Sequence, residues 1–213
     1  MTDDDFQYVT KLLANGLIQS PCLELGVGYE EGWVCKELLL EAGVDYVGTD
    51  MISGPAVDYV VDFEEDWATV QRLLPEAGAF GSALVLNVLE HTFQPVKVLD
   101  NVFKVLRPQG TCIVVTPAVW PLHDFPYDCC RLLPNFYEQY CKRRSLQLLD
   151  NYFEYVGRGN VRNYKVQESY TFPPPSDNYM QQMKSRIVHK LFNTTARTMF
   201  FPCHIAVGLV IRK

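Results

Sequence analysis

The feature that most constrains the fold is a regular alternation of short apolar segments with longer amphipathic ones. Helical spacing of apolar residues occurs at 30–42, 66–74 and 95–106. Between these stretches lie β-branched runs that are apolar throughout, as strands buried on both faces of a parallel sheet are. The alternation predicts a Rossmann-like, doubly wound α/β sheet with helices on both faces. The predicted strands are PCLEL (21–25), VDYVG (44–48), VDYVV (57–61), ALVLN (83–87) and TCIVVTP (111–117).

The two ends of the chain extend this pattern. Residues 3–15, within an N-terminal segment 1–18, predict a helix, and HIAVGLVIR (204–212) predicts a last strand. A length of 213 residues suits a single domain, 1–213. Two stretches interrupt the alternation, and we interpret 118–145 and 157–203 as a substrate-side loop and insert. Within and beside them we expect a helix at 134–144, a strand at 146–156 and an insert helix at 177–198.

Charge and cysteine content exclude several classes of protein. A formal net charge of -6 disfavours binding to bulk nucleic acid or to an anionic membrane, although CKRR (141–144) is a local basic run. The seven cysteines form no C-x-x-C pair, so we expect reduced thiols, no disulfide framework and no metal site. The acidic start MTDDDFQYVT does not resemble a signal peptide, which favours a cytoplasmic protein. The oligomeric state is not indicated.

A glycine-rich turn follows the first predicted strand, in CLELGVGYEEG (22–32). Such a turn is where a doubly wound sheet binds ligands. Gly26 and Gly28 fit the dinucleotide fingerprint G-x-G-x-x-G, but Glu31 stands where its third glycine belongs. The carboxylates of Glu30 and Glu31 would repel a pyrophosphate at the helix N-terminus. No Walker sequence occurs either. A nicotinamide dehydrogenase or a nucleotidase is therefore disfavoured.

Acidic residues close three successive predicted strands. Glu24 offers negative charge beside the glycine turn, Asp50 can accept both hydrogens of a ribose diol, and Asp62 can accept from an adenine amino group. Phe63 can lie against that ring. Each acid taken singly could instead cap a helix or be a plain strand-end charge. Together they favour a ligand with an adenosine end and a cationic amino-acid end.

At this point the chain resembles the class I S-adenosylmethionine-dependent methyltransferases, of the small-molecule type with LEH after the fourth strand. The resemblance covers residues 20–117 and fades beyond 150. PLHDFPYDCCRLLP (121–134) is similar, less specifically, to a P-x-D-x-x-R segment in bacterial-type members. The motifs that carry it are ELGVG, GTDM, VVDFEED, LNVLEH and VFKVLRPQGTCIVVTP.

The resemblance implies a seven-stranded sheet with its last strand antiparallel, and S-adenosylmethionine as the cofactor, with S-adenosylhomocysteine as its product. Two departures from the family pattern are Gln109, in the turn before the fifth strand, and Tyr29, directly behind the second glycine. The implied cofactor residues are Glu24, Gly26, Gly28 and Asn87 at the methionine end, Asp50 and Met51 at the ribose, and Asp62 and Phe63 at the adenine.

The acceptor side is less defined by the sequence. His91 and His123 are candidate bases or substrate-orienting residues, since histidine titrates near neutral pH. His91 could equally cap the turn into the next helix. Asp124, Asp128 and Arg131 could contact a polar substrate, or an ion pair among them could pin the loop.

The sequence therefore predicts an enzyme, a methyltransferase that moves a methyl group from S-adenosylmethionine to a small-molecule acceptor by in-line displacement. The acceptor and the atom that is methylated are not indicated, because a fold does not fix its substrate. The alternative is a non-catalytic binding module of the same fold, which would dock a protein partner through FPPPSDNYMQQMKSRIVHKLF (172–192).

Overall fold

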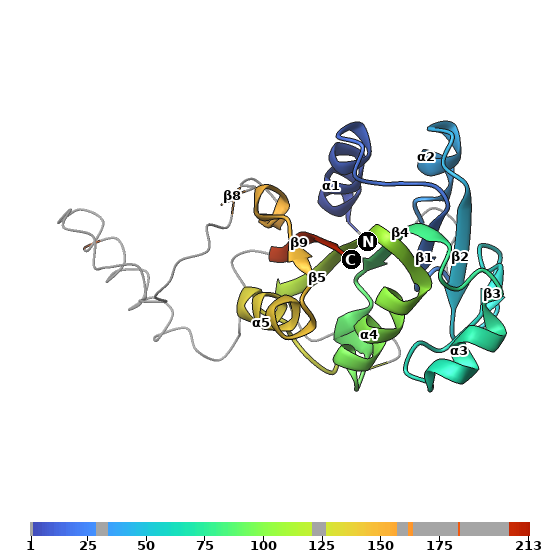
Figure 1. Ribbon diagram of the computed structural model, residues 1–213. Helices are drawn as coiled ribbons and strands as arrows, with labels where there is room; N and C mark the ends of the chain where they lie inside the picture. Colours follow the sequence, from blue (N-terminus) through green and yellow to red (C-terminus); the bar gives the residue numbers. More distant parts are fainter. Residues whose placement is uncertain (1, 29–33, 121–126, 157–161, 164–182, 184–204) are drawn as a thin grey trace. The chain divides into compact units, whose positions relative to one another are not determined.

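The structure is a computed structural model that describes the chain except for residues 1, 29–33, 121–126, 157–161, 164–182 and 184–204 (Figure 1). The chain divides into two compact units. The first unit, Met1–Tyr164 with Cys203–Lys213, carries the sheet. The second, Lys165–Pro202, lies almost wholly outside the described residues, as does most of the insert helix expected at 177–198.

The first unit alternates strands and helices as the sequence predicts. Its helices are α1 (Asp3–Ala14), α2 (Lys36–Glu41), α3 (Trp67–Leu73), α4 (Pro95–Val105) and α5 (Pro134–Arg144), with short 3-10 turns η1 (Leu89–His91) and η2 (Asp150–Tyr152). Its strands are β1 (Cys22–Leu25), β2 (Tyr46–Asp50), β3 (Tyr59–Val60), β4 (Phe80–Leu86), β5 (Leu106–Val119), β6 (Gln147–Leu148), β7 (Glu154–Val156), β8 (Arg162–Asn163) and β9 (Ile205–Arg212).

The strands form one sheet in the order β3-β2-β1-β4-β5-β9-β7-β8, with β6 also paired to β9. β1 lies parallel to β2 and β4, and β4 lies parallel to β5. β9 is antiparallel to both β5 and β7. The predicted doubly wound sheet with an antiparallel last strand is confirmed. The two-residue strands β6 and β8 add to the seven that were expected.

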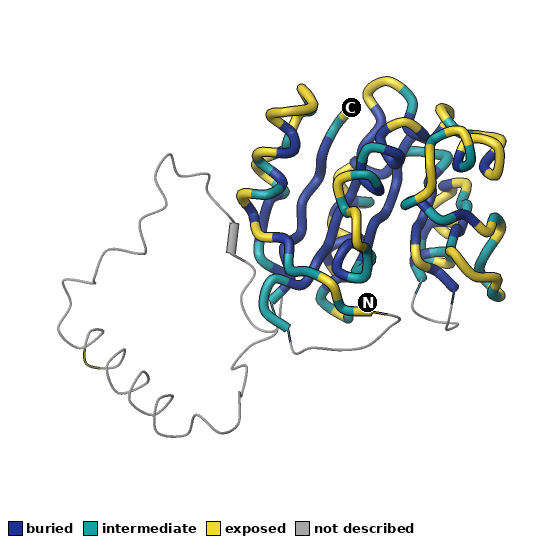
Figure 2. Tube along the Cα trace, turned by 90° about the horizontal axis from the view of Figure 1, so that it is seen from below, coloured by how far each residue is buried: buried dark blue, intermediate teal, exposed yellow. Residues whose placement is uncertain are grey.

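Helices cover both faces of the sheet (Figure 1). α1 and α2 pack on one face, in a core cluster that includes Leu12, Leu39 and Leu84. α3, α4 and α5 pack on the other face, in a cluster that includes Leu99 and Tyr137. The central strands are accordingly buried along their length (Figure 2). This arrangement explains why the central strands are mainly apolar instead of alternating between apolar and polar residues.

Polar contacts along its length hold the helix α1 in position. Thr2 and Asp5 form a capping box, in which each side chain accepts from the other residue's backbone N–H at 3.3 and 2.7 Å. Further along, the Tyr8 hydroxyl donates to Tyr152 O at 2.6 Å, and Lys11 Nζ lies 2.8 Å from Glu154 Oε1. These contacts tie α1 to the segment that contains η2 and β7.

Several element boundaries differ from the prediction. β5 begins at Leu106 because the RPQG segment bulges out of the strand, with Gln109 at a φ of 63° and a register shift against β4. The strand expected at 146–156 is broken into β6 and β7 by η2, where Asp150 and Asn151 are residues that favour turns. α2 begins only at Lys36 and ends at Glu41, because the described residues Val34 and Cys35 form a bend before it. In the part of the chain described, no helix is both long and apolar enough to cross a membrane.

Candidate functional site

The glycine turn after β1 is held by two close approaches of the backbone. Gly26 has a φ of 79°, and a Cβ there would lie 2.6 Å from Val88 Cγ2. A Cβ on Gly28 would lie 2.6 Å from Asp50 Cγ. Only glycine fits both positions without displacing its neighbour. The turn is thereby packed against the residues that follow β4 and against the end of β2, while Tyr29, Glu30 and Glu31 lie outside the described residues.

The Asp50 carboxylate binds two backbone N–H groups, one in the glycine turn after β1 and one directly after β2. Its Oδ2 accepts from Gly28 N at 2.8 Å, and its Oδ1 accepts from Ile52 N at 3.1 Å. Met51 beside it is exposed. The next turn folds directly onto the glycine turn, because a Cβ on Gly54 would lie 2.2 Å from Gly28 O. Asp50 therefore stands where the glycine turn and the end of β2 meet, with carboxylate lone pairs still available for hydroxyl donors.

Glu24 is buried beneath the turn, with 2% of its surface exposed. Its Oε2 accepts from Cys35 N and from the Tyr46 hydroxyl, both at 2.9 Å. Burial raises the pKa of the Glu24 carboxyl to about 7, although these donors lower it. Glu24 therefore anchors the residue before α2 to the core, and its carboxyl titrates close to neutral pH.

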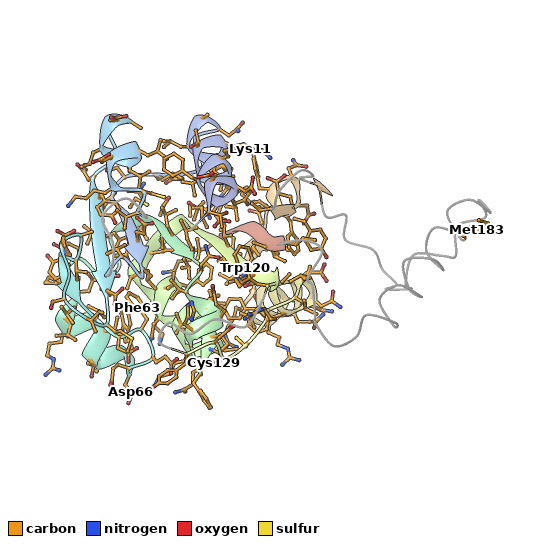
Figure 3. The ribbon with its side chains drawn as sticks, turned by 180° about the vertical axis from the view of Figure 1, so that it is seen from behind. Lys11, Phe63, Asp66, Trp120, Cys129 and Met183 are labelled. Atoms are coloured by element: carbon orange, nitrogen blue, oxygen red, sulfur yellow. The ribbon has the colours of Figure 1, made fainter. Side chains whose placement is uncertain are left out.

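The residues after β3 form a local turn. Asp62 Oδ1 accepts from Glu64 N at 2.7 Å. Phe63 is only 5% exposed and belongs to the core cluster that also contains residues of α3 and α4. It is labelled in Figure 3. Its carbonyl oxygen accepts from Asn101 Nδ2 at 3.0 Å. The proposed adenine contacts of Asp62 and Phe63 stay predictions.

Asn87 joins the end of β4 to the first turn of α1. It has a φ of 53°, and its Nδ2 donates to Asp5 Oδ2 at 3.0 Å. Asp5 is 2% exposed, so this contact is shielded from water. The start of α1 therefore lies over the carboxyl end of β4, beside the glycine turn.

The substrate-side candidates converge on η1, the LEH segment after β4. The backbone N–H groups of Cys129 and Cys130 donate to Glu90 O at 2.7 and 3.2 Å. His91 Nδ1 lies 2.6 Å from Tyr127 O, so this nitrogen must carry the proton. These bonds attach residues 127–130 to η1. Trp120 and Cys129 are labelled in Figure 3, and His123 and Asp124 lie outside the described residues.

Asp128 and Arg131 form a two-pronged ion pair. Arg131 Nη2 donates to Asp128 Oδ2 at 2.6 Å, and Arg131 Nη1 donates to Asp128 Oδ1. The Asp128 side chain is 2% exposed and the Arg131 side chain 24%. Arg131 also donates to the carbonyl oxygens of Cys130 and Trp120. The sequence left open whether these residues contact a substrate or form an ion pair that pins the loop. The two-pronged geometry of Asp128 and Arg131 fits an ion pair that holds residues 128–131 in place.

Glu90 was not singled out from the sequence, although it stands in the middle of LEH. It is 1% exposed, and burial raises its pKa to about 8. Its Oε2 has no hydrogen-bond partner among the residues described. The available signal was an acid inside a short turn directly after a buried strand, at the edge of the sheet where ligands bind.

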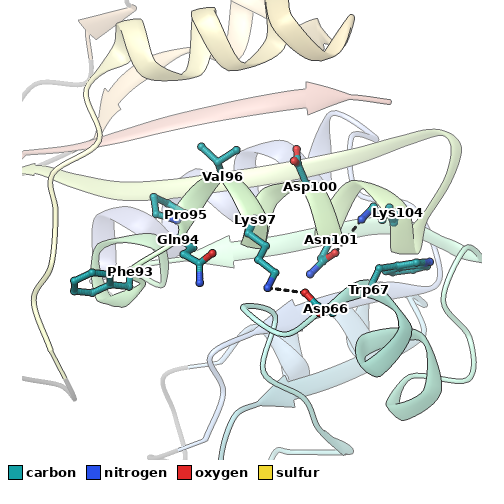
Figure 4. A pocket seen from close by; sticks show the side chains of 10 residues that line it. All are labelled: Asp66, Trp67, Phe93, Gln94, Pro95, Val96, Lys97, Asp100, Asn101 and Lys104. Carbon is teal, nitrogen blue, oxygen red and sulfur yellow. Dashed lines mark hydrogen bonds and ion pairs between the residues drawn. The ribbon is translucent and has the colours of Figure 1, made fainter.

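A separate groove of about 520 Å³ lies between α3 and α4 (Figure 4). Lys97 Nζ lies 2.9 Å from Asp66 Oδ1 across it, and Lys104 Nζ lies 5.4 Å from the centre of the Trp67 ring. None of the cofactor, catalytic or substrate residues that the sequence predicts lines this groove. In the described part of the chain, no group of three His, Cys, Asp or Glu side chains could hold a metal ion.

No family model matches the chain, and no curated protein matches it by sequence. Solved structures do match. A SAM-dependent methyltransferase from Archaeoglobus fulgidus has 13% identity and a TM-score of 0.54, over 99% of this chain and 95% of that one. The 1,6-didemethyltoxoflavin-N1-methyltransferase of Burkholderia thailandensis, solved with 1,6-didemethyltoxoflavin and S-adenosylhomocysteine, has 14% identity and a TM-score of 0.61, over 99% and 78%.

A third match is the [4+2]-cyclase SpnF, with 16% identity and a TM-score of 0.56, over 96% of this chain and 80% of that one. At these identities the likeness establishes the fold alone. It agrees with the strand order found here and with the antiparallel position of β9. The chain has the fold of the class I SAM-dependent methyltransferases.

Proposed function

We propose that the chain is an S-adenosylmethionine-dependent methyltransferase that acts on a small-molecule acceptor. The observation that carries the proposal is the Asp50 carboxylate, 2.8 Å from Gly28 N at the junction of the glycine turn and β2. That junction is the ligand-binding edge of a doubly wound sheet. The fold supports the same cofactor, since the Burkholderia thailandensis enzyme was solved with S-adenosylhomocysteine.

The residues present at this edge fit such a cofactor. Asp50 has lone pairs for the ribose hydroxyls beside the exposed Met51. In the proposal, Glu24, Gly26, Gly28 and Asn87 lie at the methionine end, and Asp62 and Phe63 at the adenine end. Acidic side chains at three strand ends suit a ligand with a positive charge and oppose a pyrophosphate. The glycine turn contacts Asp50 directly, through the bond from Gly28 N to Oδ2.

The cofactor supplies a methyl group on a sulfonium, which is already electrophilic. The chain therefore has to bring the acceptor into line with that methyl group and keep water away from it. Alignment alone lowers such a barrier by about 7–11 kcal/mol. His91 and His123 remain the predicted base or orienting residues, and Asp124, Asp128 and Arg131 the predicted acceptor-side contacts. His91 is tied to Tyr127 O at 2.6 Å, a contact that suits an orienting role.

The alternative, a non-catalytic binding module, has no observation in its favour. The segment it would use, residues 172–192, lies outside the described residues except for Met183. The likeness to a [4+2]-cyclase is the reason to test turnover as well as binding, because one fold serves several chemistries.

Calorimetry with S-adenosylhomocysteine tests the proposal. We expect the wild type to bind it and Asp50→Asn to bind it at least about tenfold more weakly. Asparagine keeps an oxygen for Gly28 N but loses the charge and one acceptor for the ribose. Asp66→Asn is the matched control, because Asp66 is an exposed aspartate paired with Lys97.

Turnover is then measured as S-adenosylhomocysteine released from S-adenosylmethionine with a panel of small amines, phenols and thiols. Wild type that binds neither form of the cofactor contradicts the proposal. Binding that Asp50→Asn and Asp66→Asn leave equally unchanged removes Asp50 from it.

A further inference from the structure

Glu90 has an unpartnered polar atom in the interior of the first unit. Its side chain is 1% exposed, and Oε2 has no hydrogen-bond partner in the part of the chain described. Leaving a buried polar atom unsatisfied is destabilising, and more so when the group is charged. Other carboxylates around this edge, those of Glu24 and Asp50, are both bound by backbone N–H groups. Oε2 of Glu90 can therefore accept from a donor that the described residues do not provide.

Glu90 lies beside the proposed cofactor site. It belongs to η1, which follows β4 directly at the carboxyl end of the strand. Val88, two residues earlier, contacts the glycine turn, since a Cβ on Gly26 would lie 2.6 Å from Val88 Cγ2. Asn87 bonds to the first turn of α1. The segment that carries Glu90 is therefore in contact with the turn expected to hold the cofactor.

The charged groups around Glu90 stabilise its ionised carboxyl only in part. Arg131 lowers the pKa of the Glu90 carboxyl, whereas Asp128 raises it. Arg131 is bound in a fork to Asp128, which reduces what it can offer Glu90. His91 Nε2 lies 3.8 Å from the other oxygen, Oε1. The Cys130 thiol and the Tyr137 hydroxyl also interact with Glu90, and Tyr137 is hydrogen-bonded to Thr116 at 2.7 Å.

We propose that Glu90 Oε2 accepts the hydrogen of an N–H or O–H group on the methyl acceptor and takes up that proton during transfer. This inference rests on the proposed methyltransferase function. In the step, the acceptor's nitrogen or oxygen forms a bond to the methyl carbon. The carbon–sulfur bond breaks with its electron pair going to sulfur, and the acceptor's proton moves to Glu90 Oε2. Charge and atoms balance, with S-adenosylhomocysteine and a protonated Glu90 as results.

Glu90 suits this role better than His91 does. The bond from His91 Nδ1 to Tyr127 O requires Nδ1 to hold its proton, and Nε2 faces Glu90 Oε1. His91 is thus a positioning residue beside Oε1 of the carboxyl, while Oε2 has no hydrogen-bond partner in the described residues. A base with a pKa of about 8 is well matched to proton transfer near neutral pH. The inference also narrows the acceptor to amines, amides, phenols or alcohols, since carboxylates carry no such hydrogen.

The first test needs no knowledge of the natural acceptor. Glutamate labelled at the δ-carbon gives one NMR resonance per residue, and the Glu90 resonance is the one missing from Glu90→Gln. With S-adenosylhomocysteine bound, we expect this resonance to titrate with a midpoint of about 8. We also expect a saturable shift with phenol or benzylamine and none with anisole, which matches phenol but lacks the O–H. Glu41→Gln, on the exposed face of α2, serves as the control for the substitution.

Each outcome decides the matter. A Glu90 resonance that is already ionised at about pH 5, or one that responds equally to phenol and anisole, overturns the proposal. No response to either phenol or benzylamine overturns it as well. Loss of S-adenosylhomocysteine binding by wild type instead contradicts the proposed function, so the two failures are distinct. Should Glu90→Gln fold poorly, Glu90→Asp identifies the resonance, because it removes the labelled glutamate while keeping a carboxyl.

Discussion

The two sides of the proposed site are built differently. On the cofactor side, Glu24, Asp50 and Asp62 each accept hydrogen bonds from backbone N–H groups. On the acceptor side, Asp128 is bound by a side chain, and Glu90 keeps one oxygen without a partner in the described residues. Backbone donors fix a carboxylate through the fold itself. A buried carboxylate oxygen without a partner lowers the stability of the fold, and such costs are concentrated at functional sites. The comparison indicates that backbone contacts fix the carboxylates of the cofactor side. On the acceptor side, a carboxylate oxygen without a partner in the described residues is the one that we propose to accept a proton.

The largest expected effect comes from Glu90→Gln, which removes the proton acceptor and leaves the cofactor side intact. We expect kcat to fall by about 10²–10⁴-fold with any N–H or O–H acceptor. S-adenosylhomocysteine affinity should stay within about twofold of wild type. The wild-type rate should rise with pH up to about 8, and the variant should lose this dependence. The rate of S-adenosylhomocysteine release checks it, and an equal rate in both proteins would remove the distinction between the two sides.

Arg131→Leu tests whether the acceptor side depends on its buried ion pair. Taking the guanidinium from the buried Asp128 carboxylate should lower the free energy of unfolding by about 3 kcal/mol. Arg144→Leu is the control, because Arg144 binds Asp100 at 2.8 and 2.7 Å but is 43% exposed. That change should cost at most about 1 kcal/mol. Urea unfolding measures both, and similar losses would mean that burial of the pair is unimportant.

Gly54→Ala disturbs the cofactor side by packing alone. Its Cβ would lie 2.2 Å from Gly28 O, so the turn after β2 must move away from the glycine turn. We expect a loss of about 2 kcal/mol in stability and weaker binding of S-adenosylhomocysteine. Gly43→Ala has a φ of 75° but no atom within 4 Å, so it should cost only about 1 kcal/mol of backbone strain. Unchanged affinity in Gly54→Ala would show that this turn plays no part in binding.

The smallest effect, taken per titrating group and per pH unit, is a slope of stability with pH. Burial raises the pKa of Glu24 to about 7 and that of Glu90 to about 8, from 4.5. In these windows the folded chain binds more protons than the unfolded one, so stability falls as pH rises. Each group contributes at most about 1.4 kcal/mol per pH unit. Glu24→Gln should remove only the Glu24 contribution to the slope, between about 4.5 and 7, and leave the Glu90 contribution between about 4.5 and 8, as chemical unfolding at several pH values can verify.

Much of the cofactor side was predictable because its contacts are local in the sequence pattern. Strand ends meet at one edge of a parallel sheet, so Glu24, Asp50 and Asp62 were expected near the glycine turn. The role of Gly54 was not predictable, since it depends on how the turn after β2 folds onto Gly28. Phe63 was assigned to a ring contact, and only the structure reveals how deeply it is buried in the core.

The acceptor side could not be predicted to the same extent. LEH was recognised as a motif, and the sequence offered His91 and His123 as candidate bases because histidine titrates near neutral pH. The structure adds Glu90 as a candidate, since burial raises its pKa into the same range while a carbonyl engages His91 Nδ1. The bulge at Gln109 was missed because pairing with β4 determines it. The break at η2 was missed although Asp150 and Asn151 favour a turn there.

The sequence alone determined the doubly wound sheet, its antiparallel last strand and the glycine turn, because periodicity and turn residues act over short distances along the chain. Tertiary structure decided which charged groups are paired and which are left open. Glu90 and the segment 127–131 are far apart in sequence, and their burial arises only when η1 and that segment pack together. Desolvation and pairing are properties of the packed molecule, so the burial of Glu90 and its raised pKa are set by the tertiary structure.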